Sequence, residues 1–209
     1  DAMISLIHPS WGRPKQAHDA YVEWLSKSDG DFEYIISIDT TDPKHAQYYQ
    51  HFPESCILLN PNRSIVDAVN VGARHATGDI LVVMSDDFGC PQGWDTEIIE
   101  RCYDNTALHV FDTIQKDIIT LPIMTRQVYE QLGFIYFDRY ISMFADNDLT
   151  ECVKRLGAYK QAFDLVFEHR HYVNGKSKMD ATYARENSPQ AWKVGEKLFE
   201  IRKRLNFGV

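Results

Sequence analysis

Two neighbouring carboxylates follow an apolar run in the first half of the chain. Asp86 and Asp87 follow residues 80–84, which are all apolar, and only Ser85 lies between. Adjacent carboxylates repel each other unless a partner relieves the repulsion, and Mg²⁺ or Mn²⁺ bound to their oxygens would also bridge to phosphate oxygens. A helix cap or a turn explains the same residues about as well, because aspartate is common in both. The other acidic residues at strand ends favour the metal site.

A second acidic group begins an expected helix, and a histidine pair follows later. Asp146 is at the start of helix 146–156, where a carboxylate could act as general base on an acceptor hydroxyl. Ordinary first-turn acidity is the commoner explanation of such a residue. His169 and His171 are two apart in an expected strand, so alternation puts them on one face as a possible metal site. Ordinary hydrogen-bonded histidines are the commoner explanation of such a pair, and Arg170 should point the other way.

An arginine precedes an expected helix that starts after Ser64. Arg63 at such a helix N-terminus could bind an anion, and Asn70 lies within the helix; a plain capped helix is the alternative. Trp11 and Trp94 could stack on a sugar ring, although core packing accounts for them as well. The chain has no glycine-rich dinucleotide fingerprint after its first strand and no phosphate-binding P-loop motif, which counts against those enzyme classes.

The first half of the chain supplies the elements that would position these residues. Apolar runs at residues 3–8, 32–38, 56–59 and 80–84 alternate with helical patterns at 14–26, 44–51 and 65–76. Strands that alternate with helices predict an α/β fold with a mostly parallel central sheet flanked by helices. Ligands bind beyond the carboxyl ends of such strands, and the polar residues there are Ser10, Asp39 and Asp86.

The second half is less regular. We expect a helix at 93–102, a hairpin over 108–121, a helix at 126–132, a strand at 162–171 and a final helix from Ser188 to about residue 205. No linker or repeat is visible, so residues 3–209 are predicted to form one domain. Its parts would be a nucleotide-binding half at 3–88, an acceptor and metal half at 89–186, and a C-terminal helix at 187–209.

Composition narrows the class of protein. Hydrophobic residues make up 44% of the 209 residues, which supports a sizeable core, and the net charge of −8 disfavours proteins that grip phosphate backbones. No apolar run approaches the ~20 residues of a membrane helix, so we expect a cytoplasmic protein. The oligomeric state is not indicated. The cysteines lack metal-site spacing and are expected to be free thiols: Cys56, Cys90, Cys102 and Cys152.

Residues 62–87 resemble the core of glycosyltransferase family 2, whose members have the GT-A fold. The family's Asn-x-Gly, Ala-x-Gly and Asp-x-Asp motifs are similar, in that order, to residues 70–72, 76–78 and 85–87. The resemblance extends backward to Pro9 and Ser10, in a turn that holds base and ribose, and to Asp39, which would contact the nucleobase. It implies that Asp87 is the direct metal ligand, helped by Asp86 or by a water molecule.

The resemblance also extends forward to the acidic motif at 145–149 and to residues 155–157. It places Asp146 at the catalytic base and lets His169 or His171 complete the metal site. The implied activity is metal-dependent, inverting transfer of a sugar from a nucleotide-diphosphate sugar, with Mn²⁺ or Mg²⁺. The acceptor would be a glycan or another hydroxyl-bearing molecule, modified nucleic acid included. Ser85 and Ala145 depart from the family motifs, where Asp and Glu are usual.

Three other functions compete with this interpretation. A sugar-phosphate nucleotidyltransferase shares the strand and helix plan, but residues 8–13 are a poor copy of the glycine-rich loop of that class. A metal hydrolase could use the two histidines and the acids. A degenerate nucleotide-binding module is suggested by the two departures from the motifs, and it would bind nucleotide without consuming a sugar donor.

Overall fold

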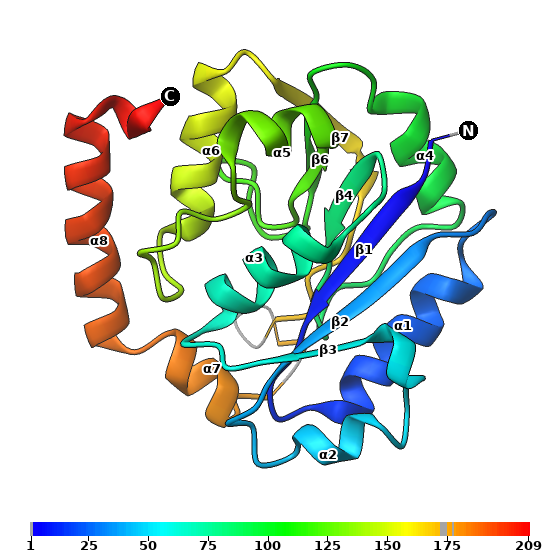
Figure 1. The fold of residues 1–209 in the computed structure, drawn as a ribbon. Helices are drawn as coiled ribbons and strands as arrows, with labels where there is room; N and C mark the ends of the chain where they lie inside the picture. Colours follow the sequence, from blue (N-terminus) through cyan, green and yellow to red (C-terminus); the bar gives the residue numbers. More distant parts are fainter. Residues whose placement is uncertain (1, 172–174, 177) are drawn as a thin grey trace.

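The computed structural model describes residues 2–171, 175–176 and 178–209, and it is built on a seven-stranded sheet (Figure 1). The strand order is β3-β2-β1-β4-β6-β5-β7. Four strands are parallel: β1 (Ile4–Pro9), β2 (Glu33–Asp39), β3 (Ile57–Asn60) and β4 (Ile80–Val83). The short β6 (Ile123–Thr125) is antiparallel to both β4 and β5 (Ala107–Phe111), and β7 (Tyr159–Val166) is parallel to β5. The predicted α/β class is confirmed.

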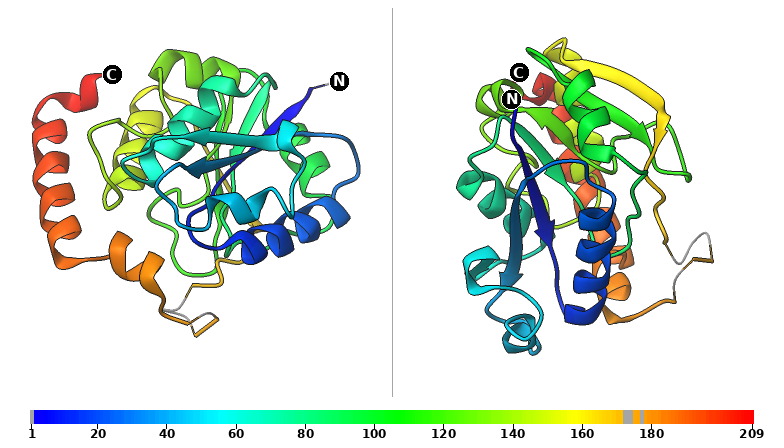
Figure 2. Two further views of the ribbon diagram at one scale, coloured as in Figure 1. Left: turned by 60° about the horizontal axis from the view of Figure 1, so that its bottom comes forward. Right: turned by 90° about the vertical axis from the view of Figure 1, so that its right-hand side faces the viewer.

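Helices cover both faces of this sheet (Figure 2). On one face α1 (Pro14–Ser26) and α4 (Trp94–Arg101) pack in one hydrophobic core. The other face carries α3 (Ile65–His75), α5 (Arg126–Leu132) and α6 (Ala145–Arg155). The remaining helices are peripheral: α2 (His45–Tyr48), α7 (Ala181–Glu186), α8 (Pro189–Arg204) and the 3-10 turns Glu54–Cys56 and Asn206–Gly208.

Strand β4 shows why its sequence is apolar throughout. Ile80 and Val82 belong to the core under α1 and α4, while Leu81 and Val83 belong to the opposite core. Successive side chains of a strand point to opposite faces, so a strand that is covered on both sides needs an apolar residue at every position. The acidic residues begin only where this burial ends.

Two helices begin as the sequence predicts. The Ser64 hydroxyl accepts a hydrogen bond from the amide of Val66 at the start of α3, and Ser188 caps α8 through the amide of Ala191. Within α3, a Cβ on Gly72 would lie 2.6 Å from a methyl carbon of Ile7. Glycine at this position therefore lets α3 pack closely on β1.

The second half departs from prediction in two places. The hairpin expected over 108–121 has the wrong bounds: β5 does pair with the antiparallel β6, but β6 begins only at Ile123, and residues 112–122 form a long loop between the two strands. Asp112 explains the turn, since one carboxylate oxygen accepts the amides of Ile114 and Gln115 and the other accepts the Thr120 hydroxyl. The strand expected at 162–171 instead runs from 159 to 166, so His169 and His171 follow it rather than lie in it.

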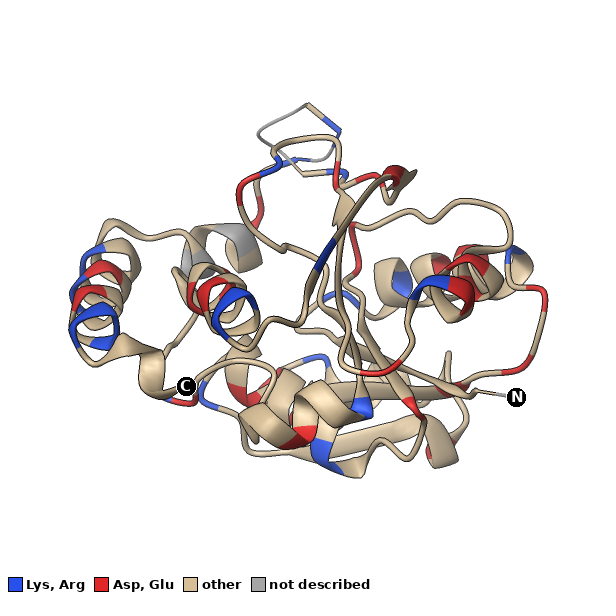
Figure 3. Cartoon of the chain, turned by 90° about the horizontal axis from the view of Figure 1, so that it is seen from above, with Lys and Arg blue, Asp and Glu red and all other residues tan. Residues whose placement is uncertain are grey.

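Helix α8 lies at the outer flank of the molecule, with basic and acidic residues mixed along it (Figures 1 and 3). Arg202 fastens it to α6, because its guanidinium donates to both oxygens of the buried Asp148 at 2.8 and 3.0 Å. All four cysteines are free, as expected. Among the described residues, no helix combines the length and hydropathy needed to cross a membrane.

Candidate active site

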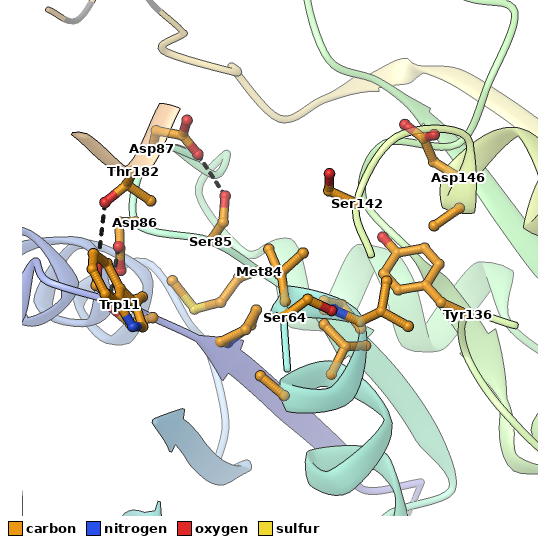
Figure 4. Close-up of a pocket in the computed structure, with 18 of the residues that line it drawn as sticks. Trp11, Ser64, Met84, Ser85, Asp86, Asp87, Tyr136, Ser142, Asp146 and Thr182 are labelled. Atoms are coloured by element: carbon orange, nitrogen blue, oxygen red, sulfur yellow. Dashed lines mark hydrogen bonds between the residues drawn. The ribbon is translucent and has the colours of Figure 1, made fainter. Parts of the chain in front are cut away.

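A cavity of about 300 Å³ opens at the carboxyl ends of β1, β2 and β4 (Figure 4). Its wall is completed by the N-terminus of α3, the start of α6, the segment after β7, and α7. The lining includes most of the predicted site residues: Pro9, Ser10, Asp39, Asp86, Asp87, Asp146, His169 and His171. Topology alone therefore gathers residues that are up to about 160 positions apart in the chain, as expected for an α/β sheet.

Asp86 is held in a buried polar network at the end of β4. One carboxylate oxygen lies 2.8 Å from Nε2 of His8, and the other accepts the Ser10 hydroxyl at 3.0 Å. His8 in turn contacts the Tyr34 hydroxyl, and Ser10 contacts that of Tyr48, each at 2.8 Å. Burial raises the pKa of Tyr34 and Tyr48, with a smaller contribution from the charge of Asp86. Both oxygens of Asp86 are thus engaged by the protein, and the residue fixes the turn that precedes Asp87.

Asp87 faces the histidine segment. The Ser85 hydroxyl donates to one of its oxygens at 2.5 Å, and Nε2 of His169 lies 3.3 Å from the other. Ser85 therefore orients the carboxylate of Asp87, two residues later. Figure 4 shows Ser85 and Asp87 at the same end of the cavity.

A short antiparallel ladder brings these two segments together. Phe88 pairs with His169, the amide of Arg170 donates to the carbonyl of Asp87 at 2.7 Å, and the amide of Gly89 donates to that of Glu168 at 2.9 Å. The rings of Phe88 and His169 stack with centroids 4.3 Å apart. Pairing across 80 residues of sequence is invisible to local patterns, and it explains why His169 reaches Asp87 although β7 has already ended.

The residues around Asp87 fit a divalent cation that is shared with a substrate. Among the described residues, no set of three His, Cys, Asp or Glu side chains forms a metal site. Mg²⁺ and similar ions, however, are commonly held by one or two carboxylates together with substrate phosphates. Asp87 and His169 could supply an oxygen and a nitrogen ligand. The His171 ring is 5.0 Å from that of His169, and burial lowers its pKa, which favours the neutral imidazole that binds metals.

Asp146 lines the other end of the cavity, at the second residue of α6 (Figure 4). It is partly buried, and its pKa is raised to about 6, mainly by burial, with the like charge of Asp112 adding to the effect. Burial also raises the pKa of the nearby Tyr136, which therefore stays a hydroxyl donor. Asp148 is directed away, into its contact with Arg202. Of the two acids in the motif, only Asp146 can therefore meet a substrate.

A further part of the cavity wall is formed at the ends of β1 and β2. Asp39 is buried at the end of β2, where one oxygen accepts the amide and the hydroxyl of Thr41 at 2.8 and 2.9 Å. Trp11 lines this end, and its carbonyl accepts the Thr182 hydroxyl of α7 at 3.2 Å. Trp94 is fully buried in the core and cannot stack on a sugar. Sequence reasoning missed Thr182 and Tyr136, because their elements gave no recognisable pattern.

Two predicted ligands do not reach the cavity. Arg63 is exposed, and its guanidinium is taken by both oxygens of Asp67, at 2.8 and 2.6 Å, and by the carbonyl of Asp138. Asn70 is buried, and its amide group bonds the backbone of Ile135 and Tyr136 at 2.7 to 3.1 Å. The structure thus corrects both roles: Arg63 closes a local ion pair, and Asn70 fixes the segment that carries Tyr136.

The strand order, the cavity at the strand ends and the facing Asp87 and His169 define a protein of the GT-A fold class. The chain belongs to glycosyl transferase family 2, because the family's sequence profile matches residues 5–166. This confirms the family that the motifs suggested. No curated protein matches the chain.

Solved structures support the same fold. S. aureus TarS superposes with a TM-score of 0.62 at 12% identity, covering 79% of this chain and 36% of TarS, so the chain spans about a third of that protein. A mannosyltransferase from Pyrobaculum calidifontis, in complex with GDP-Man and Mn²⁺, gives 0.61 at 14%, covering 97% and 75%. A Drosophila galactosyltransferase 7 mutant, with manganese, UDP-Gal and xylobiose, gives 0.58 at 13%, covering 90% and 80%. At these identities the likeness establishes the fold.

Proposed function

We propose that this chain transfers a sugar from a nucleotide-diphosphate sugar to an acceptor hydroxyl with the help of a divalent cation. One observation carries the proposal: a single cavity holds Asp87 facing His169 at one end and Asp146, with its pKa raised to about 6, at the other. The similar structures that contain Mn²⁺ with GDP-Man or UDP-Gal support this donor class.

The chain's residues divide the work between donor and acceptor. Pro9, Ser10 and Asp39 at the strand ends would hold the nucleoside. Asp87 and His169, with His171 beside them, would hold the cation near the diphosphate. A cation bound there stabilises the negative charge that develops on the departing diphosphate.

Asp146 is suited to take the proton of the acceptor hydroxyl. A general base works best when its pKa lies near the working pH, and burial raises the pKa of Asp146 toward that range. In this scheme the acceptor approaches from the side of the sugar opposite the diphosphate, and a single displacement inverts the anomeric centre. The acceptor would be a glycan or another hydroxyl-bearing molecule.

A panel of nucleotide sugars tests the proposal. GDP-mannose, UDP-galactose and UDP-N-acetylglucosamine are added with and without Mn²⁺, and donor binding is followed by thermal shift. Transfer is then measured as release of nucleoside diphosphate in the presence of acceptor glycans. We expect Asp87→Ala to weaken Mn²⁺-dependent donor binding, and Asp146→Asn to keep donor binding and lose transfer. Asp164→Asn, at an exposed carboxylate paired with Arg101, is the matched control.

The competing functions give different results in the same assays. Full transfer by both the Asp87 and Asp146 variants would refute the mechanism. Release of pyrophosphate from a nucleoside triphosphate and a sugar phosphate would identify a nucleotidyltransferase. Turnover of simple esters without nucleotide would identify a hydrolase, and Mn²⁺-dependent donor binding with no transfer to any acceptor would identify a binding module.

A further inference from the structure

The segment that carries both histidines is fastened to α1 by an ion pair. Arg170 donates through Nη1 and Nη2 to the two oxygens of Glu23, at 2.7 and 2.9 Å. Lys27 donates to the same carboxylate at 2.8 Å, and the hydrogen bond from Arg170 is the main reason that the pKa of Glu23 falls to about 2. Paired bonds between a guanidinium and a carboxylate fix direction as well as distance.

Arg170 also touches the cavity edge through its backbone. Its amide donates to the carbonyl of Asp87, and the residue lies between His169 and His171 in the chain. The side chain of Arg170 thus bonds to α1, while its backbone bonds to Asp87, the residue that would bind the cation. Past the end of β7 at Val166, backbone hydrogen bonds hold this segment on two sides: the short ladder with residues 87–89, and the amide of His169, which donates to the carbonyl of Asp112 at 2.9 Å.

Gly89 is the position over which this side chain crosses. A Cβ built on Gly89 would collide with Nη2 of Arg170, lie 2.9 Å from its Cζ, and come within 3.2 Å of an oxygen of Glu23. Gly89 does not have a positive φ, so its backbone would accept alanine. Glycine is therefore needed here because it leaves room for the ion pair, and not because the backbone conformation requires it.

We propose that the pair formed by Arg170 and Glu23, seated over Gly89, positions His169 against Asp87 and thereby sets the affinity of this edge for a divalent cation. This inference rests on the proposed function, because it concerns the same cation. The cation affinity of a site with two protein ligands depends on the distance between those ligands. Removing a residue that orients a metal ligand typically lowers the affinity by about 10- to 100-fold.

The same pair should contribute little to global stability. The side chains of Arg170 and Glu23 are 40% and 20% exposed, so solvent screens the pair, and its contribution to stability is smaller than the lowered pKa of Glu23 alone would suggest. Variants that break this pair are therefore expected to lower the cation affinity without lowering the thermal stability. That separation distinguishes a positioning role from a merely structural one.

The test measures Mn²⁺ binding directly. Free Mn²⁺ is counted by electron paramagnetic resonance during titration of the protein, in the presence of UDP and, separately, of GDP. We expect Glu23→Gln and Gly89→Ala each to raise the Kd for Mn²⁺ about tenfold or more, with little change in Tm. Glu97→Gln, which removes one of the two acidic partners of Arg101 on α4, is the matched control and should leave the Kd unchanged.

Gly89→Ala keeps both charges, so agreement between it and Glu23→Gln would assign the effect to the position of the guanidinium. The charge-swapped double variant Glu23→Arg with Arg170→Glu should recover part of the lost affinity. Unchanged Kd values in both single variants would overturn the inference and leave the proposed function standing. So would a loss of Mn²⁺ affinity that is accompanied by a clear fall in Tm. Failure of the unaltered protein to bind Mn²⁺ would overturn the cation site itself and this inference with it.

Discussion

Replacing Asp146 with asparagine should stabilise the protein while it removes the proposed base. Burial raises the pKa of Asp146 from its ordinary value of 3.8 to about 6, so the folded state disfavours the ionised carboxylate. A difference of about two units, at about 1.4 kcal/mol each, amounts to roughly 2–3 kcal/mol as an upper figure. Asparagine carries no charge and escapes this cost.

The sign of the effect depends on pH. Well below pH 3.8 the carboxyl is protonated in both the folded and the unfolded chain, so the variant should have nearly the stability of the original protein. The cost of ionisation grows as the pH rises toward 6 and is fully present above it, so the advantage of Asp146→Asn should appear over that interval.

Urea unfolding at several pH values measures this difference, with Asp164→Asn as a matched substitution at an exposed carboxylate. We expect the Asp146 variant to gain about 2 kcal/mol at neutral pH and above, and to retain nucleotide-sugar binding. Equal stability of the variant and the original protein at all pH values would show that the carboxylate is not destabilised by the fold. It would also remove the basis for Asp146 as a base tuned toward neutrality.

Two further substitutions test the supports of the site. Arg202→Ala should cost about 3–5 kcal/mol in urea unfolding, because it leaves the buried carboxylate of Asp148 unpaired; a loss under 1 kcal/mol would contradict the buried ion pair. Asn70→Ala removes three hydrogen bonds to the backbone that carries Tyr136, and should cost on the order of 2–4 kcal/mol by the same measurement. Native stability in that variant would show that the clamp at Asn70 is dispensable.

The strands of the first half could be predicted because each is a mostly apolar run with a clear end. The polar residues that follow them, Ser10, Asp39 and Asp87, meet as the parallel arrangement requires. Strand β6, by contrast, has three residues, too few to show a period, and residues 112–122 follow the local bonds of Asp112. Secondary structure was thus predictable where a mostly apolar run is bounded by turn residues, even in β3, which is short and only partly buried.

The errors at the site have a different origin. Arg63 has Asp67 four residues later, and helical spacing makes that pair the obvious competitor for an incoming anion, so this signal was present in the sequence. Asn70 bonds backbone groups 65 and 66 positions away, which no local pattern reveals. Nor does the sequence say which acid of the 146–148 motif faces the cavity; that depends on the contact between Asp148 and Arg202.

The short antiparallel pairing of β6 with β4 has a consequence for any attempt to isolate the amino-terminal half. Strand β4 is buried on both faces and hydrogen-bonded on both edges, by β1 and by β6. A polypeptide cut near residue 88 would bare one edge of this apolar strand, and such an edge templates pairing with other chains. The half that carries the β1 and β2 end of the cavity is therefore expected to aggregate rather than bind ligand by itself.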